Sequence, residues 1–145
     1  MNAIPSTSLM TTILFVDDEP ALRRAAHRWF ERTGTRIFTA ENVQEAKRCL
    51  ESHPIDGAFI DVCLRDGTGI ELLAWIWENY PGTARNVVLL SGDIDRTPLF
   101  LRGRGTGAVQ ILGKPFDLSV LESYVARWAG AWSGTRPNRP NLQAP

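Results

Sequence analysis

The residues of this chain best suited to chemistry are acidic side chains that directly follow short apolar runs. The stretch TTILFVDDEP ends its apolar run in Asp17, Asp18 and Glu19, and Pro20 follows. Val, Ile and Phe favour a buried strand, and proline is tolerated at the first turn of a helix because its missing N–H has no helical partner there. The stretch therefore predicts a strand, an acidic corner and a helix. Adjacent carboxylates suit Mg²⁺, which takes oxygen ligands, although a solvated loop with Asp as a helix cap is the ordinary alternative.

Three later apolar runs also end in a side chain that could do chemistry. DGAFID runs into Asp61, RNVVLLSG reaches Ser91, and AVQILGKPF ends around Lys114 and Pro115. The carboxyl ends of parallel strands meet at one edge of a sheet, and ligands gather there. We therefore expect one pocket that combines carboxylates, a hydroxyl and an ammonium group.

This combination suits phosphoryl transfer. Asp18 and Asp61 can each give Mg²⁺ an oxygen, and Asp17 can hold a coordinated water. A metal between the carboxylates keeps Asp61 ionised and hence nucleophilic. Ser91 and Lys114 are suited to hold the equatorial oxygens of the transferred group.

Five alternations of strand and helix must position these residues. They predict an α/β fold, a doubly wound five-stranded parallel sheet with helices on both faces. The helix after Pro20 should stop at Gly34, and the next should open at Asn42 with Glu45 completing a capping box. The face of the first helix that should pack on the sheet consists of Leu22, Ala25, Ala26, Trp29 and Phe30.

The segment after Asp61 should turn on Gly67 and start a helix capped by Thr68 with Glu71. Trp75 and Trp77 cannot both face the core of one helix, so one of them is expected on the surface. The residues predicted to face the core from this helix are Ile70, Leu73 and Trp77.

The remaining segments have weaker patterns. Pro98 allows only a short helix from about Thr97, and GRGTGA at residues 103–108 is predicted to be a turn because its spacing fits no phosphate loop. Residues 1–10 read as an N-terminal tail, residues 11–130 as one domain, and residues 131–145 as a flexible tail or linker.

Composition excludes several classes of function. The chain has 145 residues, 43% of them hydrophobic, and its 16 basic and 16 acidic side chains cancel, so no overall field favours nucleic acid or a membrane. Cys49 and Cys63 are too few for a disulfide framework and lie in no metal spacing, which favours a reducing, cytoplasmic setting. The sequence has no signal peptide pattern and no apolar stretch long enough to span a bilayer.

Four motifs together resemble the response-regulator receiver domain of bacterial two-component signalling, in the CheY-like superfamily. VDDEP is similar to its acidic-pair motif, FIDVCLRDGTGIELL to the phospho-acceptor motif, VVLLSG to the hydroxyl motif and GKPF to the lysine motif. The resemblance runs from Thr11 to about Gly130, and it implies the strand order 2-1-3-4-5.

The resemblance also implies a role for each residue of the site. Asp61 would be the phosphorylated aspartate, and the metal site for Mg²⁺ would use Asp17 through water, Asp18, Asp61 and the backbone carbonyl of Cys63. The remaining residues with implied roles are Ser91 and Gly92 at the phosphoryl-binding switch, Lys114 as its counter-ion, and Pro115 after a cis peptide bond.

For function, the resemblance implies a phosphoprotein in a phosphorelay. It would take its phosphoryl group from a sensor histidine kinase or a histidine phosphotransfer protein and then change its affinity for partners. It would be no enzyme beyond self-phosphorylation and autodephosphorylation. The face made by the last strand and its flanking helices is a candidate homodimer surface, and neither nucleic acid nor membrane is an expected partner of this segment.

Two positions depart from the family pattern. Arg65 replaces the usual proline four residues after the acceptor, which concerns the rigidity of the loop and not the chemistry. Ile111 replaces the aromatic residue that usually acts as a rotating switch three residues before Lys114. We therefore expect the switch to depend on Ser91.

Other functions are less well supported by the sequence. A haloacid-dehalogenase-like phosphohydrolase would need Asp-x-Asp after the first strand, whereas Asp17 and Asp18 are adjacent. A degenerate receiver would not retain the full set of site residues. His27 and His53 lie in no metal spacing, and the arginines of the first helix are expected to form a solvated face or, alternatively, a docking surface.

Overall fold

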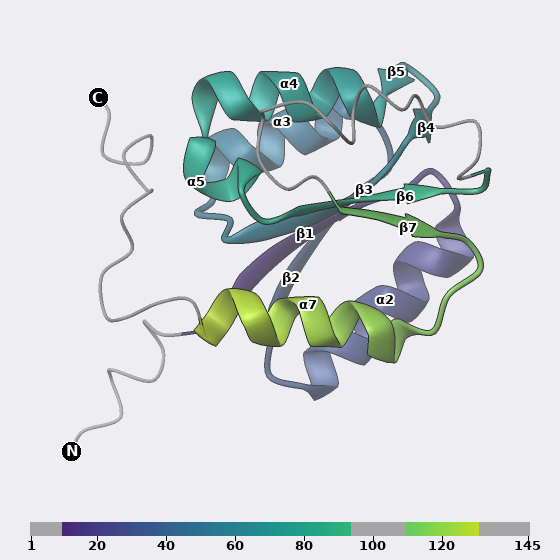
Figure 1. The fold of residues 1–145 in the computed structure, drawn as a ribbon, viewed down its shortest axis with the longest axis vertical. Helices are drawn as coiled ribbons and strands as arrows, with labels where there is room; N and C mark the ends of the chain where they lie inside the picture. The colour runs from purple at the N-terminus through teal and green to yellow at the C-terminus, as the bar shows by residue number, and fades with distance from the viewer. Residues whose placement is uncertain (1–9, 94–109, 131–145) are drawn as a thin grey trace.

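A single parallel sheet forms the centre of the molecule (Figure 1). The computed structural model describes residues 10–93 and 110–130. The sheet has the order β2-β1-β3-β6-β7, which is the expected order 2-1-3-4-5 because the short β4 and β5 pair separately. Its strands are β1 (Thr12–Val16), β2 (Arg36–Ala40), β3 (Gly57–Asp61), β6 (Val87–Ser91) and β7 (Gln110–Gly113).

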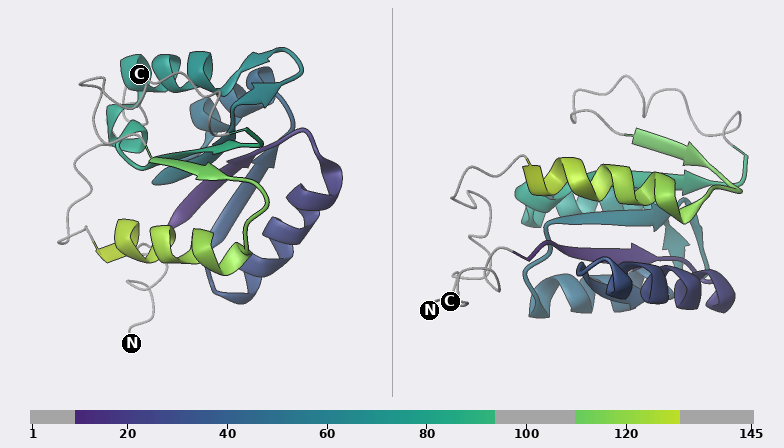
Figure 2. Two further views of the ribbon diagram at one scale, coloured as in Figure 1. Left: turned by 45° about the vertical axis from the view of Figure 1, so that its right-hand side comes forward. Right: turned by 90° about the horizontal axis from the view of Figure 1, so that it is seen from below.

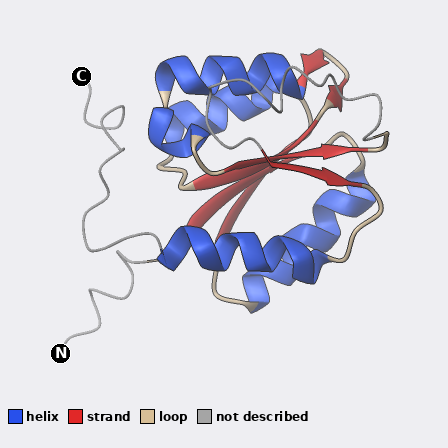
Figure 3. Ribbon diagram, viewed as in Figure 1, coloured by secondary structure: helices blue, strands red, loops and turns tan. Residues whose placement is uncertain are grey.

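Helices cover both faces of the sheet (Figures 1 to 3). One face carries α2 (Pro20–Arg32) and α7 (Leu118–Gly130), and the other carries α3 (Val43–Ser52), α4 (Gly69–Asn79) and α5 (Pro81–Ala84). The alternation along β1 divides its side chains between the two cores. Ile13 and Phe15 pack beneath α2 and α7, whereas Leu14 and Val16 pack beneath α3 and α4. A sheet buried on both faces explains why its strands read as continuous apolar runs.

The predicted helix starts are present, with one difference in hydrogen bonding. Thr68 and Glu71 form the full capping box of α4. At α3, the Asn42 side chain accepts from the Glu45 N–H at 2.8 Å, but the Glu45 carboxylate accepts from the backbone N–H of Glu41. Only half of the predicted capping box is therefore formed at α3.

The predicted core face of α4 was partly wrong. Leu73 is buried, but Ile70 and Trp77 are only partly buried, and Leu72 and Ile76 are buried in their place. The expectation that Trp75 or Trp77 is exposed was also wrong, since both rings pack against the edge of this core. In the structure the buried stripe begins at Gly69, where an added Cβ would clash with the Asp61 carbonyl, and it continues at helical spacing through Leu72, Leu73 and Ile76.

Two features were absent from the predictions. The tetrapeptide Pro81–Ala84 forms α5, and the loop after Asp61 contains the two-stranded hairpin of β4 (Cys63–Leu64) and β5 (Gly67–Thr68). At α2, the helix ends at Arg32, and Gly34 follows in the left-handed conformation with φ of 81°, as its predicted stop requires. The predicted helix near Thr97, the turn at residues 103–108 and the tail at residues 131–145 lie outside the described residues.

Candidate functional site

The first acidic corner is built by the end of β1 and the start of α2. Asp17 is fully buried, and its backbone N–H donates to the Ala40 carbonyl at the end of β2. One of its carboxylate oxygens accepts from the Glu19 N–H at 2.8 Å, which turns the chain into the helix that Pro20 begins. The carboxylate is therefore held in place by the backbone around it.

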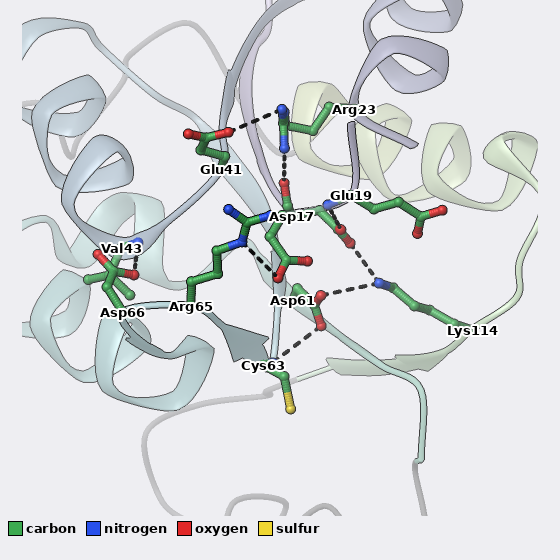
Figure 4. Close-up of polar contacts among 11 residues, drawn as sticks. Asp17, Glu19, Arg23, Glu41, Val43, Asp61, Cys63, Arg65, Asp66 and Lys114 are labelled. Atoms are coloured by element: carbon green, nitrogen blue, oxygen red, sulfur yellow. Dashed lines mark hydrogen bonds and ion pairs between the residues drawn. The ribbon is translucent and has the colours of Figure 1, made fainter. Parts of the chain in front are cut away.

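Lys114 joins this corner to the end of β3 (Figure 4). Its Nζ lies 2.7 Å from Asp17 Oδ2 and 3.2 Å from Asp61 Oδ2. The other oxygen of Asp61 accepts from the Cys63 N–H at 3.3 Å. Lys114 follows β7, whose parallel pairing with β6 carries it to the same edge as the two aspartates. The predicted convergence of these strand ends is confirmed.

The three carboxylates Asp17, Asp18 and Asp61 are close enough to share one cation. Each offers an oxygen, and these oxygens all lie within 4.8 Å of one another. Hard oxygen donors are the ligands that Mg²⁺ prefers. The donor set therefore fits the metal that the sequence predicts, with Cys63 exposed beside it on β4.

The predicted phosphoryl-binding residues lie at the same edge of the sheet. Ser91 is buried at the end of β6, and its Oγ accepts from the Asp93 N–H at 3.1 Å. Gly92 follows it and is exposed. The Lys114–Pro115 peptide bond is cis, as the resemblance implies. Ile111 lies two residues before the end of β7 and is partly buried against the core beneath α4.

Burial and neighbouring charges both affect the pKa values of Asp61 and Lys114. Burial raises the pKa of Asp61, the neighbouring Asp17 charge raises it further, and Lys114 offsets only part of this effect. Burial alone would lower the pKa of Lys114, but hydrogen bonds and charges from Asp17 and Asp61 outweigh burial and raise it. The lysine is thus firmly protonated, whereas an ionised Asp61 is held at a cost that a cation would relieve.

Sequence reasoning missed the support that Arg23 gives to the acidic corner. Arg23 was assigned to a solvated face, but its side chain is only 18% exposed. Its Nη1 donates to the Asp17 carbonyl at 2.8 Å, and its Nη2 lies 3.4 Å from Glu41 after β2. The one signal for this contact was its position in the first turn of the helix, directly beside the corner.

The loop after Asp61 also holds contacts that the sequence did not reveal. Asp66 accepts from the backbone N–H groups of Val43 and Gln44, at 2.8 and 3.1 Å, and so caps α3 from another part of the chain. Arg65 was expected to concern only loop rigidity, but its Nε lies 4.0 Å from Asp18 Oδ2. Both partners are distant in sequence, so no local pattern marks them.

Comparison with known proteins agrees with this fold. The family model described as the response regulator receiver domain matches residues 13–126. The chain therefore belongs to the response regulator receiver domain family of two-component systems.

Among curated relatives, the chain is 34% identical to the response regulator protein PilR of Pseudomonas aeruginosa over 78% of this chain and 25% of that protein. It is 31% identical to the KDP operon transcriptional regulatory protein KdpE of Escherichia coli over 79% of this chain and 49% of that protein. The chain thus spans between a quarter and about half of the length of these relatives.

Solved structures show the same fold. A CheY-like receiver domain protein from Methanospirillum hungatei matches with a TM-score of 0.72 at 23% identity, covering 83% of this chain and 94% of that one. The beryllofluoride-activated NtrC4 receiver domain dimer matches with a TM-score of 0.72 at 25% identity, covering 86% and 100%. Within residues 10–93 and 110–130, no helix has the length and apolar character needed to cross a bilayer.

Proposed function

We propose that this chain is a phosphorylation-controlled switch that accepts a phosphoryl group on Asp61 in a Mg²⁺-dependent reaction. One observation carries the proposal. The buried Asp61 carboxylate lies 3.2 Å from Lys114 Nζ, and its oxygens lie within 4.8 Å of those of two further carboxylates. A nucleophile, a fixed cation and a set of hard metal ligands are the parts that phosphoryl transfer needs.

In the reaction, a carboxylate oxygen of Asp61 attacks phosphorus. A phosphorus–oxygen bond forms, the bond between phosphorus and the donor atom breaks, and the donor keeps the electron pair. Asp17, Asp18, Asp61 and the Cys63 carbonyl would hold Mg²⁺, which supplies charge neutralisation for the phosphoryl oxygens when bound. Lys114 is placed to neutralise a further oxygen, and it needs no proton transfer because its pKa is raised. The protein turns over no other substrate and only gains and loses this group.

The proposed donor is a sensor histidine kinase or a histidine phosphotransfer protein in the cytoplasm. A groove beside the site supports a docked partner, because basic side chains of α2 line it together with Thr39 of β2. The exposed Arg24 and Arg28 lie in this groove. The face that includes β7 and α7 is the proposed homodimer surface, and this part of the proposal rests on the family resemblance alone.

The proposed output signal begins at Ser91. Its hydroxyl can donate a hydrogen bond to the new phosphoryl group, and charge-assisted bonds of this kind contribute about 1.5–3 kcal/mol. Ile111 has no polar atom with which to follow that change. The response should therefore run through β6 rather than through an aromatic switch in β7.

The proposal is tested by incubating the protein with a small phosphodonor and Mg²⁺. We expect one phosphate per chain that is stable in acid and labile in base, as an acyl phosphate is. Asp61→Asn should remove the label, and excess chelator should suppress it. Equal labelling of that variant, or equal labelling with chelator present, would refute the assignment.

A further inference from the structure

Arg65 reaches from the loop after Asp61 to the metal-binding corner (Figure 4). Its Nε lies 4.0 Å from Asp18 Oδ2, and the two side chains are 73% and 36% exposed. The pair is therefore open to solvent, in contrast to the enclosed pairs that Lys114 makes with Asp17 and Asp61. Such a pair is weak enough to be broken by a competing cation.

The position of Arg65 is fixed by the fold of its loop. Cys63 pairs with Thr68 and Leu64 with Gly67, so Arg65 and Asp66 form the tip of a hairpin. The Asp66 carboxylate binds the first two backbone N–H groups of α3 at 2.8 and 3.1 Å. The tip is thus anchored on α3, and Arg65 is presented to the acidic corner by a braced backbone.

Two basic side chains pair with the three carboxylates of the site. Lys114 pairs with Asp17 and Asp61, and Arg65 pairs with Asp18. Asp18 is also a proposed Mg²⁺ ligand. A divalent cation that binds Asp18 must displace the guanidinium or remain beside its positive charge, and either event weakens cation binding.

We propose that Arg65 competes with the divalent cation for Asp18 and so sets the Mg²⁺ concentration at which the site is loaded. This inference rests on the proposed function, since it concerns the metal that phosphorylation would use. The competing charge is part of the fold, because the loop that carries Arg65 is anchored on α3 by Asp66.

The test is Mg²⁺ binding to the unphosphorylated protein, measured by isothermal titration calorimetry. Arg65→Gln should lower the Kd for Mg²⁺ roughly two- to fivefold at low ionic strength, the range expected for an exposed ion pair. The gain should shrink at high salt, where exposed charges are screened. Arg85→Gln is the matched control, because it removes the same charge from an exposed residue at the far end of β6.

The outcomes separate this inference from the function on which it rests. A lower Kd for Arg65→Gln together with an unchanged Kd for Arg85→Gln supports the competition. Equal Kd values for the wild type and Arg65→Gln, or equal gains in both variants, overturn it and leave the metal site intact. Absence of Mg²⁺ binding in both the wild type and Arg65→Gln overturns the metal site and this inference together.

Discussion

The environment of Asp61 opposes the negative charge of its carboxylate. Asp61 is 7% exposed, and its charge is opposed by burial and by Asp17 more strongly than Lys114 favours it. Active sites commonly keep such unfavourable groups because the reaction uses them. The site should therefore gain stability when that charge is removed.

We predict that Asp61→Asn unfolds at higher urea concentration than the wild type at pH 7 without Mg²⁺. The expected gain is about 0.5–2 kcal/mol, as is common when a strained site is relieved. Since the pKa of Asp61 is raised in the folded state, the wild type should gain stability as pH falls through that pKa, and the difference should fade towards the unfolded value of about 3.9. A variant less stable than the wild type at pH 7 would show that the Lys114–Asp61 pair dominates.

Ser91 and Ile111 provide a second prediction at the scale of single residues. With beryllofluoride as a phosphoryl mimic, Ser91→Ala should lose the change in hydrogen exchange across β6 and β7. Ile111→Val should keep that change and lose only about 0.5–1.5 kcal/mol of stability, since one partly buried methylene is removed. If the valine variant loses the response while the alanine variant keeps it, Ile111 is the relay.

At the scale of elements, α3 depends on an acceptor from another loop. The Asp66 carboxylate accepts from the first two N–H groups of α3. The Asn42 side chain accepts from the third, that of Glu45, and the Asn42 carbonyl accepts from the fourth, that of Ala46. The first four N–H groups of the helix are therefore all paired. The contacts of Asp66 therefore have two effects. They cap α3, and they also anchor the loop between Asp61 and α4.

We predict that Asp66→Ala lowers the free energy of unfolding by about 1 kcal/mol at pH 7, as loss of a helix cap does. Backbone hydrogen bonds, chiefly that from Val43, hold the pKa of Asp66 below its usual value. Its contribution should therefore be present above the unfolded pKa and be lost as pH falls through the lowered one. The exposed Glu78→Ala is the control in urea titrations, and equal effects of the two substitutions would refute the cap.

The sequence predicted correctly those features that depend on residues close together in the chain. Thr68 with Glu71 marked the start of α4, and the strand ends at Asp61, Ser91 and Lys114 marked the site, because both signals depend on neighbours in the chain. The contacts of Arg65 and Asp66 could not be read in this way. Arg65 and its partner Asp18 are 47 residues apart in the chain, and Asp66 and its partner Val43 are 23 residues apart.

At the scale of the whole molecule, the strands that carry the site are held in place by helices packed on both faces of the sheet. Gly57 in β3 allows one of these contacts, since a Cβ there would clash with the Trp128 ring of α7 and lie 2.8 Å from the Asn86 carbonyl. Trp128 also packs on Phe59, with ring centroids 5.0 Å apart. The strand that carries Asp61 is thus held at its start by α7 and at its end by Gly69 of α4.

We predict that Gly57→Ala costs about 1–3 kcal/mol of stability, because an overfilled core must shift its neighbours. Gly113→Ala in β7 is the matched control, since its added Cβ would meet no atom within 4 Å. Thermal or urea unfolding compares the two variants. Similar losses in both would mean that strand conformation, and not the contact with Trp128, sets the cost.

The most direct test of the whole account is chemical location of the phosphoryl group. The protein is phosphorylated with a small phosphodonor and Mg²⁺, reduced with borohydride, digested and sequenced by mass spectrometry. Borohydride converts an aspartyl phosphate into homoserine, so the account predicts homoserine at position 61 and aspartate at positions 17 and 18. Homoserine at position 17 or 18, or an unmodified Asp61 in protein shown to carry phosphate, would contradict it.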